Sequence, residues 1–285
     1  MARRALLWVF LCAAQTAWAA EARRPNVIVI FTDDHGWADL GRQDVRKDIR
    51  TPHLDLLAEG GVRATNGYVT APQCVPSRAG LLTGRYQNRF GLESNGEKLD
   101  GFDAQQTIAQ RLKKAGYATG MTGKWHLGPP PQITRHGFDD VYCTQGGPRN
   151  TWANFDLEGR TVPGQVVKND LYHLDANSAA ACAFIRRHRD KPFFFYYSMH
   201  HVHGPILRTP DTVEGTKGAD ALYEDNIRYM DKQVASVVAE LEKLSLRRFA
   251  AAAPGAAELS APFAAERERI EVEVPAVLRR CAGWL

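Results

Sequence analysis

The stretch from Ala71 to Arg85 carries the residues with the clearest chemistry, and it runs A-P-Q-C-V-P-S-R-A-G-L-L-T-G-R. Pro76 is typical of the first turn of a helix, and the apolar residues after it predict that a helix opens there. Cys74 would then lie at the positive end of that helix, with Arg78 one turn inside it. Both features favour an anionic oxygen or a thiolate at position 74. The alternative interpretation is a small buried cysteine that precedes a helix.

Two adjacent acidic residues, Asp33 and Asp34, follow a run of β-branched and apolar residues from Asn26 to Phe31. The run predicts a strand that is buried on both faces. Polar residues at the carboxyl end of such a strand lie where open α/β sheets build their sites. Neighbouring carboxylates repel each other unless a cation lies between them, and hard oxygen ligands suit Ca²⁺ or Mg²⁺. The competing interpretation is a polar turn. We expect Asp39, further along, to be an ordinary surface residue.

Lys124 and His126 lie two residues apart, between glycines and after a short predicted strand from Tyr117 to Met121. Both side chains can therefore point into a site at the end of that strand. Lysine supplies a compact positive charge there, and histidine supplies a proton relay. The alternative is a basic loop with no role in a site.

Three histidines, His200, His201 and His203, follow a second predicted buried strand from Pro192 to Met199. A group of three histidines suggests zinc. The spacing argues against a zinc site, because the side chains of adjacent residues diverge and the sequence offers no fourth ligand nearby.

The elements that must position these residues are buried strands that alternate with amphipathic helices. This alternation predicts an α/β sandwich with a mostly parallel central sheet. The clearest helices run from Thr51, a capping residue, to Gly60, from Thr107 to Ala115, and from Ala221 to Leu246. The segment from Trp152 to Asn169 has little periodicity, and we expect it to build the rim of a substrate cleft.

The chain has 285 residues and a net charge of +4 from scattered Lys and Arg residues, which does not indicate a nucleic-acid partner. Residues 1–20 are typical of a secretory signal peptide, with a basic start, an apolar run and a small-x-small cleavage site. The rival interpretation, a membrane anchor, needs a longer apolar run. We expect a soluble mature protein, secreted or periplasmic, without stable membrane insertion.

The chain has five cysteines, of which Cys12 lies in the predicted signal peptide. If Cys74 is chemically modified, Cys143, Cys182 and Cys281 remain. A Cys143–Cys182 bridge is one option, and three free, buried thiols are the other. The sequence leaves both options open.

The string C-x-P-S-R-x-x-x-L-T-G that begins at Cys74 resembles the signature of the type I, formylglycine-dependent sulfatases. The string G-Y-A-T-G-M-T-G-K-W-H, from Gly116 to His126, resembles the second signature of that family, and the G-F-D at Gly137 resembles a motif that follows it. The resemblance implies an alkaline-phosphatase-like fold and the hydrolysis of sulfate esters. For an exported enzyme, sulfated carbohydrates are the expected substrates.

The resemblance also implies a nucleophile and a metal. A formylglycine-generating enzyme would act on the chain and convert Cys74 to formylglycine, whose hydrated aldehyde attacks sulfur and leaves a sulfated intermediate. Ca²⁺, with Mg²⁺ as the less fitting choice, would be held by Asp33, Asp34 and the group at position 74.

Four further residues take catalytic roles in the family pattern. Arg78 and Lys124 would steady the hydrate and its metal against developing negative charge. His126 would contact the hydrate and act as the base, and His203 would face the sulfate and the leaving oxygen. His201 is a second candidate for the position of His203, and His200 is expected to be structural.

The resemblance covers Arg24 to Leu246, which we predict to be the N-terminal part of the catalytic domain at residues 24–246. Residues 247–285 lack the buried strand with Asp-Asn-Gly and the later lysine that sulfatases have after the long helix. We expect a divergent, non-native or disordered tail there, a C-terminally incomplete sheet and, at best, weak activity, as a frameshift or premature stop would produce. Two alternatives stay open: a phosphate or phosphonate ester hydrolase of the same superfamily, and a catalytically dead fragment that binds sulfate esters.

Overall fold

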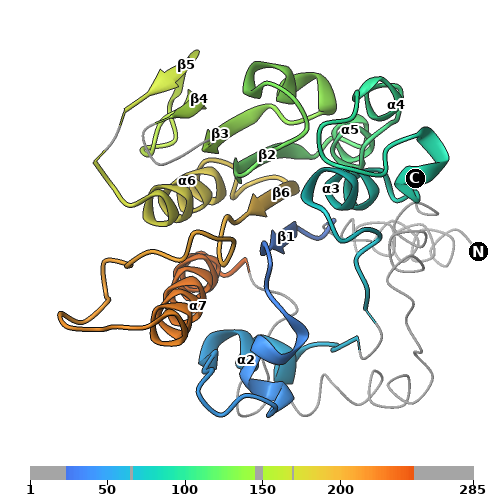
Figure 1. Ribbon diagram of the computed structural model, residues 1–285. Coiled ribbons are helices and arrows are strands. Elements are labelled where there is room, and N and C mark those ends of the chain that lie inside the picture. Colours follow the sequence, from blue (N-terminus) through green and yellow to red (C-terminus); the bar gives the residue numbers. More distant parts are fainter. Residues whose placement is uncertain (1–23, 65–66, 145–149, 169, 247–285) are drawn as a thin grey trace, which may run out of the picture.

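The computed structural model describes residues 24–64, 67–144, 150–168 and 170–246. The predicted signal peptide and the predicted tail lie outside these residues. The described chain forms three layers, in which helices cover both faces of a central sheet (Figure 1). The predicted α/β sandwich with a mostly parallel sheet is therefore confirmed.

The sheet has six strands in the described part of the chain, in the spatial order β1-β6-β2-β3-β4-β5. The first four strands in that order are parallel, whereas β4 pairs antiparallel with both β3 and β5. Their bounds are β1 (Val27–Phe31), β2 (Ala118–Gly123), β3 (Asp140–Thr144), β4 (Thr151–Phe155), β5 (Thr161–Val167) and β6 (Phe193–Ser198).

Strand β6 shows why a central strand of this sheet carries large apolar residues at successive positions. Phe193, Phe195 and Tyr197 pack into the core on one face of the sheet. Phe194 and Tyr196 pack into a second core on the opposite face. Because helices cover both faces, each side chain of this strand removes apolar area from water.

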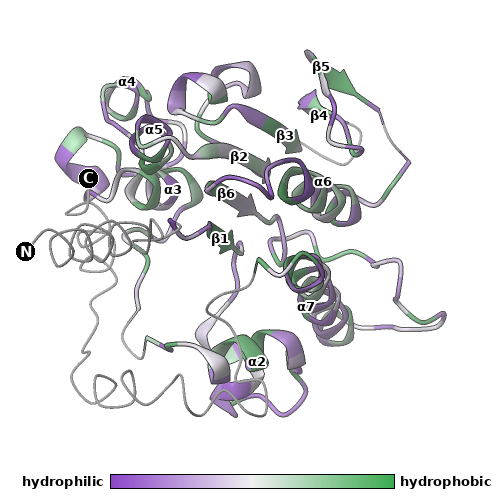
Figure 2. Cartoon of the chain, turned by 180° about the vertical axis from the view of Figure 1, so that it is seen from behind, coloured by the Kyte–Doolittle hydropathy of each residue, from purple (hydrophilic) through white to green (hydrophobic). Residues whose placement is uncertain are grey.

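The helices divide between these two cores. On one face lie α2 (Pro52–Gly60), α6 (His173–Arg187) and α7 (Ala219–Lys243), and on the other lie α3 (Cys74–Thr83) and α5 (Ile108–Lys114). Figure 2 shows hydrophobic and hydrophilic segments side by side on these helices, as amphipathic packing requires. The short helical elements are η1 (Trp37–Asp39), η2 (Gly41–Gln43), η3 (Gln87–Phe90), α4 (Asp100–Asp103) and η4 (Pro130–His136).

The start of α2 is held by a residue distant in sequence. Thr51 is at the predicted N-cap position, but its side chain makes no cap hydrogen bond to the helix. Instead, the backbone N–H groups of His53 and Leu54 donate to the Asp231 carboxylate from α7, at 3.1 and 2.8 Å. The cap thus also fastens α2 to α7.

Residues 152–168, the described part of the segment expected to build the rim of a cleft, form most of the antiparallel hairpin β4–β5. Gly164 explains how it packs, because a Cβ atom there would lie 2.5 Å from the Trp152 ring. The indole lies against bare backbone, which a periodicity search does not detect.

The described cysteines form no disulfide. Cys143 in β3 belongs to the core beside α3 and α5, and Cys182 in α6 packs against the other core. Of the two options left open by the sequence, the bridge between them is therefore wrong.

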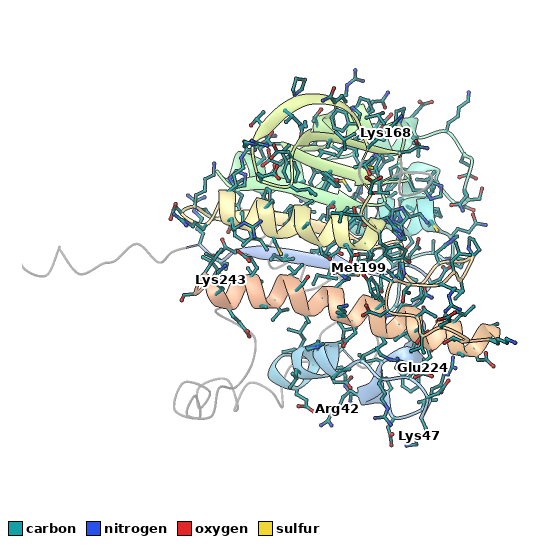
Figure 3. The ribbon with its side chains drawn as sticks, turned by 90° about the vertical axis from the view of Figure 1, so that its left-hand side faces the viewer. Arg42, Lys47, Lys168, Met199, Glu224 and Lys243 are labelled. Atoms are coloured by element: carbon teal, nitrogen blue, oxygen red, sulfur yellow. The ribbon has the colours of Figure 1, made fainter. Side chains whose placement is uncertain are left out.

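The carboxyl ends of the parallel strands meet at one edge of the sheet. In Figure 3, the buried Met199, directly after β6, lies near the arrowhead end of a strand inside the molecule, whereas Lys243, the last residue of α7, lies on the side of the opposite strand ends. Among the described residues, no helix combines the length and the apolar character that crossing a membrane requires.

Candidate active site

The site lies where β1, β2 and β6 end and α3 begins. Asp33 and Asp34 follow β1, Lys124 follows β2, and the histidine loop follows β6. Two backbone hydrogen bonds join the loops after β1 and β6: Asp33 N–H donates to the His201 carbonyl (2.9 Å), and Val202 N–H donates to the Asp33 carbonyl (2.6 Å). The loops therefore hold a fixed spacing.

Gly123 allows the loop after β2 to pack closely against the end of β6. Its φ is +91°, and a Cβ atom there would lie 1.8 Å from the Ser198 carbonyl oxygen. Glycine allows this close approach, and the N–H of the next residue, Lys124, donates to that same oxygen at 2.8 Å. The end of β2 is thus fastened to the end of β6.

Three charged side chains meet at the bottom of the site. Asp33 is 6% exposed and Arg78 is 1% exposed. Lys124 Nζ donates to Asp33 Oδ2, and Arg78 Nη2 lies 3.4 Å from the same oxygen. Burial by itself raises the pKa of Asp33, but the Lys124 hydrogen bond and the charges of Arg78 and Lys124 outweigh it and hold that pKa below its usual value. Asp33 is therefore a carboxylate.

Side chains of strand β6 contact the buried guanidinium of Arg78. Its Nη1 donates to Ser198 Oγ and lies 3.3 Å from the Tyr196 hydroxyl and 3.1 Å from the Lys124 carbonyl oxygen. Its carbon Cζ lies 5.4 Å from the centre of the Phe31 ring. Four groups from two strands and one loop therefore fix the position of this charge.

Cys74 is the first residue of α3, so the helix opens two residues before the predicted start at Pro76. Its half-buried Sγ lies 3.4 Å from Lys124 Nζ and 3.6 Å from Asp33 Oδ1. The aligned peptide dipoles of the helix give this end a partial positive charge. Position 74 therefore combines a helix dipole, an ammonium and a carboxylate within contact distance.

Trp125 explains how its two neighbours reach the site. Its indole is fully buried, packs edge-on against Phe138 and donates from Nε1 to the Leu127 carbonyl at 2.7 Å. With Trp125 pointing into the core, Lys124 on one side of it and His126 on the other belong to the site.

His126 is a neutral imidazole at neutral pH. Burial, followed by the charges of Lys124 and Arg78, lowers the pKa of His126 below its usual value. Its Nδ1 is buried and finds no hydrogen-bond partner among the described residues. A neutral ring with one unsatisfied nitrogen can take up or pass on a proton.

The outer part of the site consists of Asp34 and His203. Their side chains are 57% and 44% exposed, and His203 Nε2 lies 3.8 Å from Asp34 Oδ2. His203 Nδ1 lies 2.6 Å from the Gly204 carbonyl oxygen, which can only accept, so Nδ1 carries the ring proton and Nε2 is free to accept. His203 therefore faces the site with a basic nitrogen.

The other two histidines of the loop point away from this position. His201 is 5% exposed, and its Nε2 bonds the Tyr172 hydroxyl at 3.1 Å. The rings of His200 and His201 lie 5.7 and 5.2 Å from that of His173. Burial lowers the pKa of both His200 and His201 to about 3, so they stay neutral and structural.

One group of side chains in the described chain has metal-ligand spacing: Asp33, Cys74 and His203, whose ligand atoms all lie within 4.8 Å of one another. Their donors are a carboxylate, a thiol sulfur and an imidazole nitrogen. Asp34, which the sequence also predicted as a ligand, lies outside this group, and its Oδ2 is 3.8 Å from His203 Nε2. Calcium takes oxygen ligands. The Asp33 carboxylate fits Ca²⁺, and position 74 fits it only when an oxygen stands there in place of sulfur.

The structure brings the predicted residues together at this edge. Sequence reasoning missed two of their supports, Tyr196 and Ser198, which hold Arg78 from inside β6. Their signal in the sequence is weak, because hydroxyls in an aromatic strand resemble core residues. The predicted residues near Asp33 are Asp34, Cys74, Arg78, Lys124, His126 and His203.

A family model described as Sulfatase matches residues 25–249. Arylsulfatase A of Bos taurus is 34% identical, over 84% of this chain and 53% of that protein. N-acetylgalactosamine-6-sulfatase of Homo sapiens is 32% identical, over 84% of this chain and 51% of that protein. The chain thus spans about half the length of these curated relatives.

A solved structure shares the arrangement. Ps i-CgsB in complex with k-i-k-neocarrahexaose superposes with a TM-score of 0.67 and 29% identity, over 80% of this chain and 57% of that one. The sequence comparisons and the structural superposition therefore both point to the sulfatase family.

Proposed function

The chain belongs to the sulfatase family, and on that premise we propose that it hydrolyses sulfate esters with a nucleophile derived from Cys74. One observation carries the proposal: Cys74 opens α3 with Lys124 Nζ 3.4 Å and Asp33 Oδ1 3.6 Å from its sulfur. The helix end and the Lys124 ammonium at this position stabilise a nucleophilic oxygen and the negative charge that grows on a sulfuryl group.

Two groups are proposed to complete the site. Formylglycine at position 74, made by a formylglycine-generating enzyme, would supply the nucleophilic hydroxyl, and Ca²⁺ rather than Mg²⁺ would supply Lewis-acid polarisation of the sulfuryl oxygens. Asp33 and Asp34 would hold the cation together with an oxygen at position 74. The two carboxylates are the hard donors that the described chain offers at this edge.

The buried cations orient the reacting groups. Arg78 cannot rotate away, because Ser198 and Tyr196 hold its Nη1. It therefore fixes the Asp33 carboxylate, and Lys124 reaches from the same carboxylate to position 74. Both charges face the place where negative charge develops, and they need no rearrangement during the reaction.

Two histidines handle the protons. His126 is neutral, because burial and the neighbouring cations lower its pKa, and it would accept a proton from the hydroxyl at position 74. His203 faces the site from the outer side, where it would take up a proton and deliver it to the leaving alcohol oxygen. The two roles need opposite protonation states, which their different exposure supports.

Sulfated carbohydrates are the proposed substrates, and the chain is proposed to act after export. A relative named N-acetylgalactosamine-6-sulfatase and a neighbour solved with k-i-k-neocarrahexaose support this substrate class. Export rests on the signal-like residues 1–20 alone.

Paired expression tests the proposal. The chain is produced with and without a formylglycine-generating enzyme, and both preparations are assayed on an aryl sulfate and on the matching aryl phosphate in the presence of Ca²⁺. We expect sulfate turnover only after co-expression, in proportion to the formylglycine found at position 74 by mass spectrometry. Equal turnover in both preparations, or preference for the phosphate ester, would contradict the proposed function.

A further inference from the structure

Before any conversion, position 74 carries a sulfur atom, and its neighbours then form a different kind of metal site. We propose that the unconverted chain binds a borderline-soft divalent cation, Zn²⁺ above all, between Asp33, Cys74 and His203. The inference rests on the location of the site proposed above and not on its catalysis. The identity of the atom at position 74 would then decide which class of metal the site accepts.

The separation of the ligand atoms fits zinc. Cys74 Sγ lies 3.6 Å from Asp33 Oδ1. A tetrahedral Zn²⁺ with bonds of about 2.3 Å to sulfur and about 2.1 Å to oxygen places those two ligands about 3.6 Å apart. The third ligand atom, on His203, lies within 4.8 Å of both. Its side chain is 44% exposed, so it can turn the remaining distance without disturbing the core.

His203 already has the hydrogen bond that metal-binding histidines make. Its Nδ1 donates to the Gly204 carbonyl oxygen at 2.6 Å. A histidine that binds a metal through one ring nitrogen usually donates the other N–H to a carbonyl or carboxylate, which fixes the tautomer. The lone pair of Nε2 is therefore available, and Nε2 is also the atom near Asp34.

The three ligands come from three elements, two of which are joined by backbone hydrogen bonds. Asp33 follows β1, Cys74 opens α3, and His203 belongs to the loop after β6. Hydrogen bonds between Asp33 and the backbone at 201 and 202 join two of these loops. A site assembled before the metal arrives binds without the cost of ordering its loops.

Lys124 does not occupy the ligand position. Its Nζ donates to Asp33 Oδ2 and lies 3.4 Å from Cys74 Sγ, whereas the Asp33 oxygen that faces the sulfur is Oδ1, so the edge between Sγ and Oδ1 stays open. The ammonium opposes a second cation nearby, but Asp33, Asp34 and a Cys74 thiolate bring more negative charge than the two buried cations offset. On binding, the thiol loses its proton to solvent, and one proton is released for each ion bound.

The donor set selects the metal. Sulfur and imidazole nitrogen beside one carboxylate suit zinc or cobalt, whereas calcium and magnesium require oxygens. Replacement of the sulfur by an oxygen therefore moves the preference from zinc towards calcium. Asp34, or water, would fill the fourth position, since Asp34 Oδ2 lies 3.8 Å from His203 Nε2.

Metal titration of the unconverted chain tests this inference. Full-length protein with an unmodified cysteine at position 74, verified by mass spectrometry, is titrated with Zn²⁺ against a chromogenic chelator. Co²⁺ serves as a second probe, because a cobalt–sulfur bond gives a charge-transfer absorption. Cys74→Ser supplies oxygen at the same place, and His203→Ala removes the nitrogen ligand. Cys182→Ser removes a half-buried thiol in α6 and is the matched control.

We expect one Zn²⁺ per chain and a cobalt–thiolate band in the unchanged chain and in Cys182→Ser. Cys74→Ser should lose the cobalt–thiolate band and bind Zn²⁺ on the order of 10–100-fold more weakly. A loss of this size is typical even when only a residue that hydrogen-bonds to a metal ligand is removed. The Ca²⁺ affinity of Cys74→Ser should not fall. His203→Ala should weaken Zn²⁺ binding and keep the band.

Two results would overturn the inference: no stoichiometric Zn²⁺ in the unchanged chain, or Zn²⁺ binding that survives Cys74→Ser undiminished. Circular dichroism of each variant shows whether it remains folded. The readout is metal bound to unconverted protein, so failure of sulfate hydrolysis, measured on converted protein, is a separate result.

Discussion

The floor and the rim of the site differ in how their charges are held. The floor consists of Asp33, Arg78, Tyr196 and Ser198, each of which is less than a tenth exposed. The rim consists of Asp34 and His203, whose side chains are 57% and 44% exposed. Each floor group contacts at least one other floor group, whereas the rim pair is separated by 3.8 Å.

The difference in exposure indicates which part of the site is rigid. A buried charge is costly unless it is paired, and here Arg78 pairs with Asp33, β6 bonds Arg78 Nη1, and Lys124 bonds Asp33. Water satisfies the rim groups until a ligand replaces it. The floor can therefore stabilise charge without moving, and the rim can adjust to the substrate.

Removal of the Lys124 charge should give the largest effect, because it connects the floor to Cys74. For Lys124→Met we expect kcat for an aryl sulfate to fall on the order of 10²–10³-fold, as when one oxyanion donor is removed. Lys113→Met, at a surface lysine paired with Asp139, is the control and should leave kcat unchanged.

The same variant should raise the pKa of His126. Burial is the first cause of the low pKa of His126, and the charge of Lys124 is the second. Removal of that charge moves the titration of His126 up towards 6.5, so the acid limb of the rate profile begins at a higher pH. NMR titration of the His126 ring measures this directly, and an unmoved His126 would separate Lys124 from the site.

His203→Ala breaks the rim and leaves the floor intact. We expect kcat to fall by about 10², within the range of general acid–base catalysis, with the greater loss for esters of poor leaving groups. The free energy of unfolding should change little, because the side chain is 44% exposed. Kinetics on a series of aryl sulfates, together with urea unfolding, measures both. Equal losses across the series would contradict the role of proton donor.

Acid should weaken the fold through the buried histidines behind the rim. Burial lowers the pKa of His173 to about 4 and the pKa values of His200 and His201 to about 3. Below pH 6.5 these histidines bind protons in the unfolded chain but not in the folded chain. Their contribution to the free energy of unfolding is therefore complete above pH 6.5 and declines towards pH 3–4.

We expect the free energy of unfolding at pH 5 to be about 6 kcal/mol below its value at pH 7, since each of the three histidines contributes about 1.4 kcal/mol per pH unit below pH 6.5. Urea titration at both pH values measures it. His201→Gln should reduce the difference, whereas His53→Gln, at an exposed position in α2, should not. An unchanged difference in His201→Gln would show that other groups carry the effect.

Ser198→Ala is the smallest and most specific change to the floor. Loss of one buried hydrogen bond should cost about 1 kcal/mol of stability and lower kcat a few-fold, because Arg78 loses a support. Ser178→Ala is the matched control: its hydroxyl bonds Tyr197 at 2.7 Å on the opposite face of the sheet. Both variants should lose similar stability, and only Ser198→Ala should lose activity. Equal kcat in the two would deny Ser198 a positioning role.

The sequence predicted the charged residues of the floor and the rim, but not Tyr196 and Ser198, the two uncharged residues of the floor. Asp33, Lys124 and His203 each follow a strand with a strong apolar pattern, so parallel pairing brings them to one edge. Tyr196 and Ser198 lie inside such a pattern, and only the pairing of β6 with its neighbours shows that they reach Arg78.

Asp39 shows the same limit in another place. It was expected on the surface, but its side chain is 10% exposed and accepts from Gly36 N–H at 3.0 Å and from the Tyr223 hydroxyl at 2.8 Å. The expectation was wrong because the tyrosine that covers it comes from α7, far along the chain. Local patterns carry no information about such distant partners.

The central claim is that the chemistry takes place at position 74. The most direct test is sulfate release from an aryl sulfate, with Ca²⁺, by protein made in a host that generates formylglycine, beside the variant Cys74→Ala. The account predicts turnover that vanishes in the variant, while thermal unfolding of the two proteins stays similar. Turnover that persists in Cys74→Ala, or none in a chain with formylglycine verified at position 74, would contradict it.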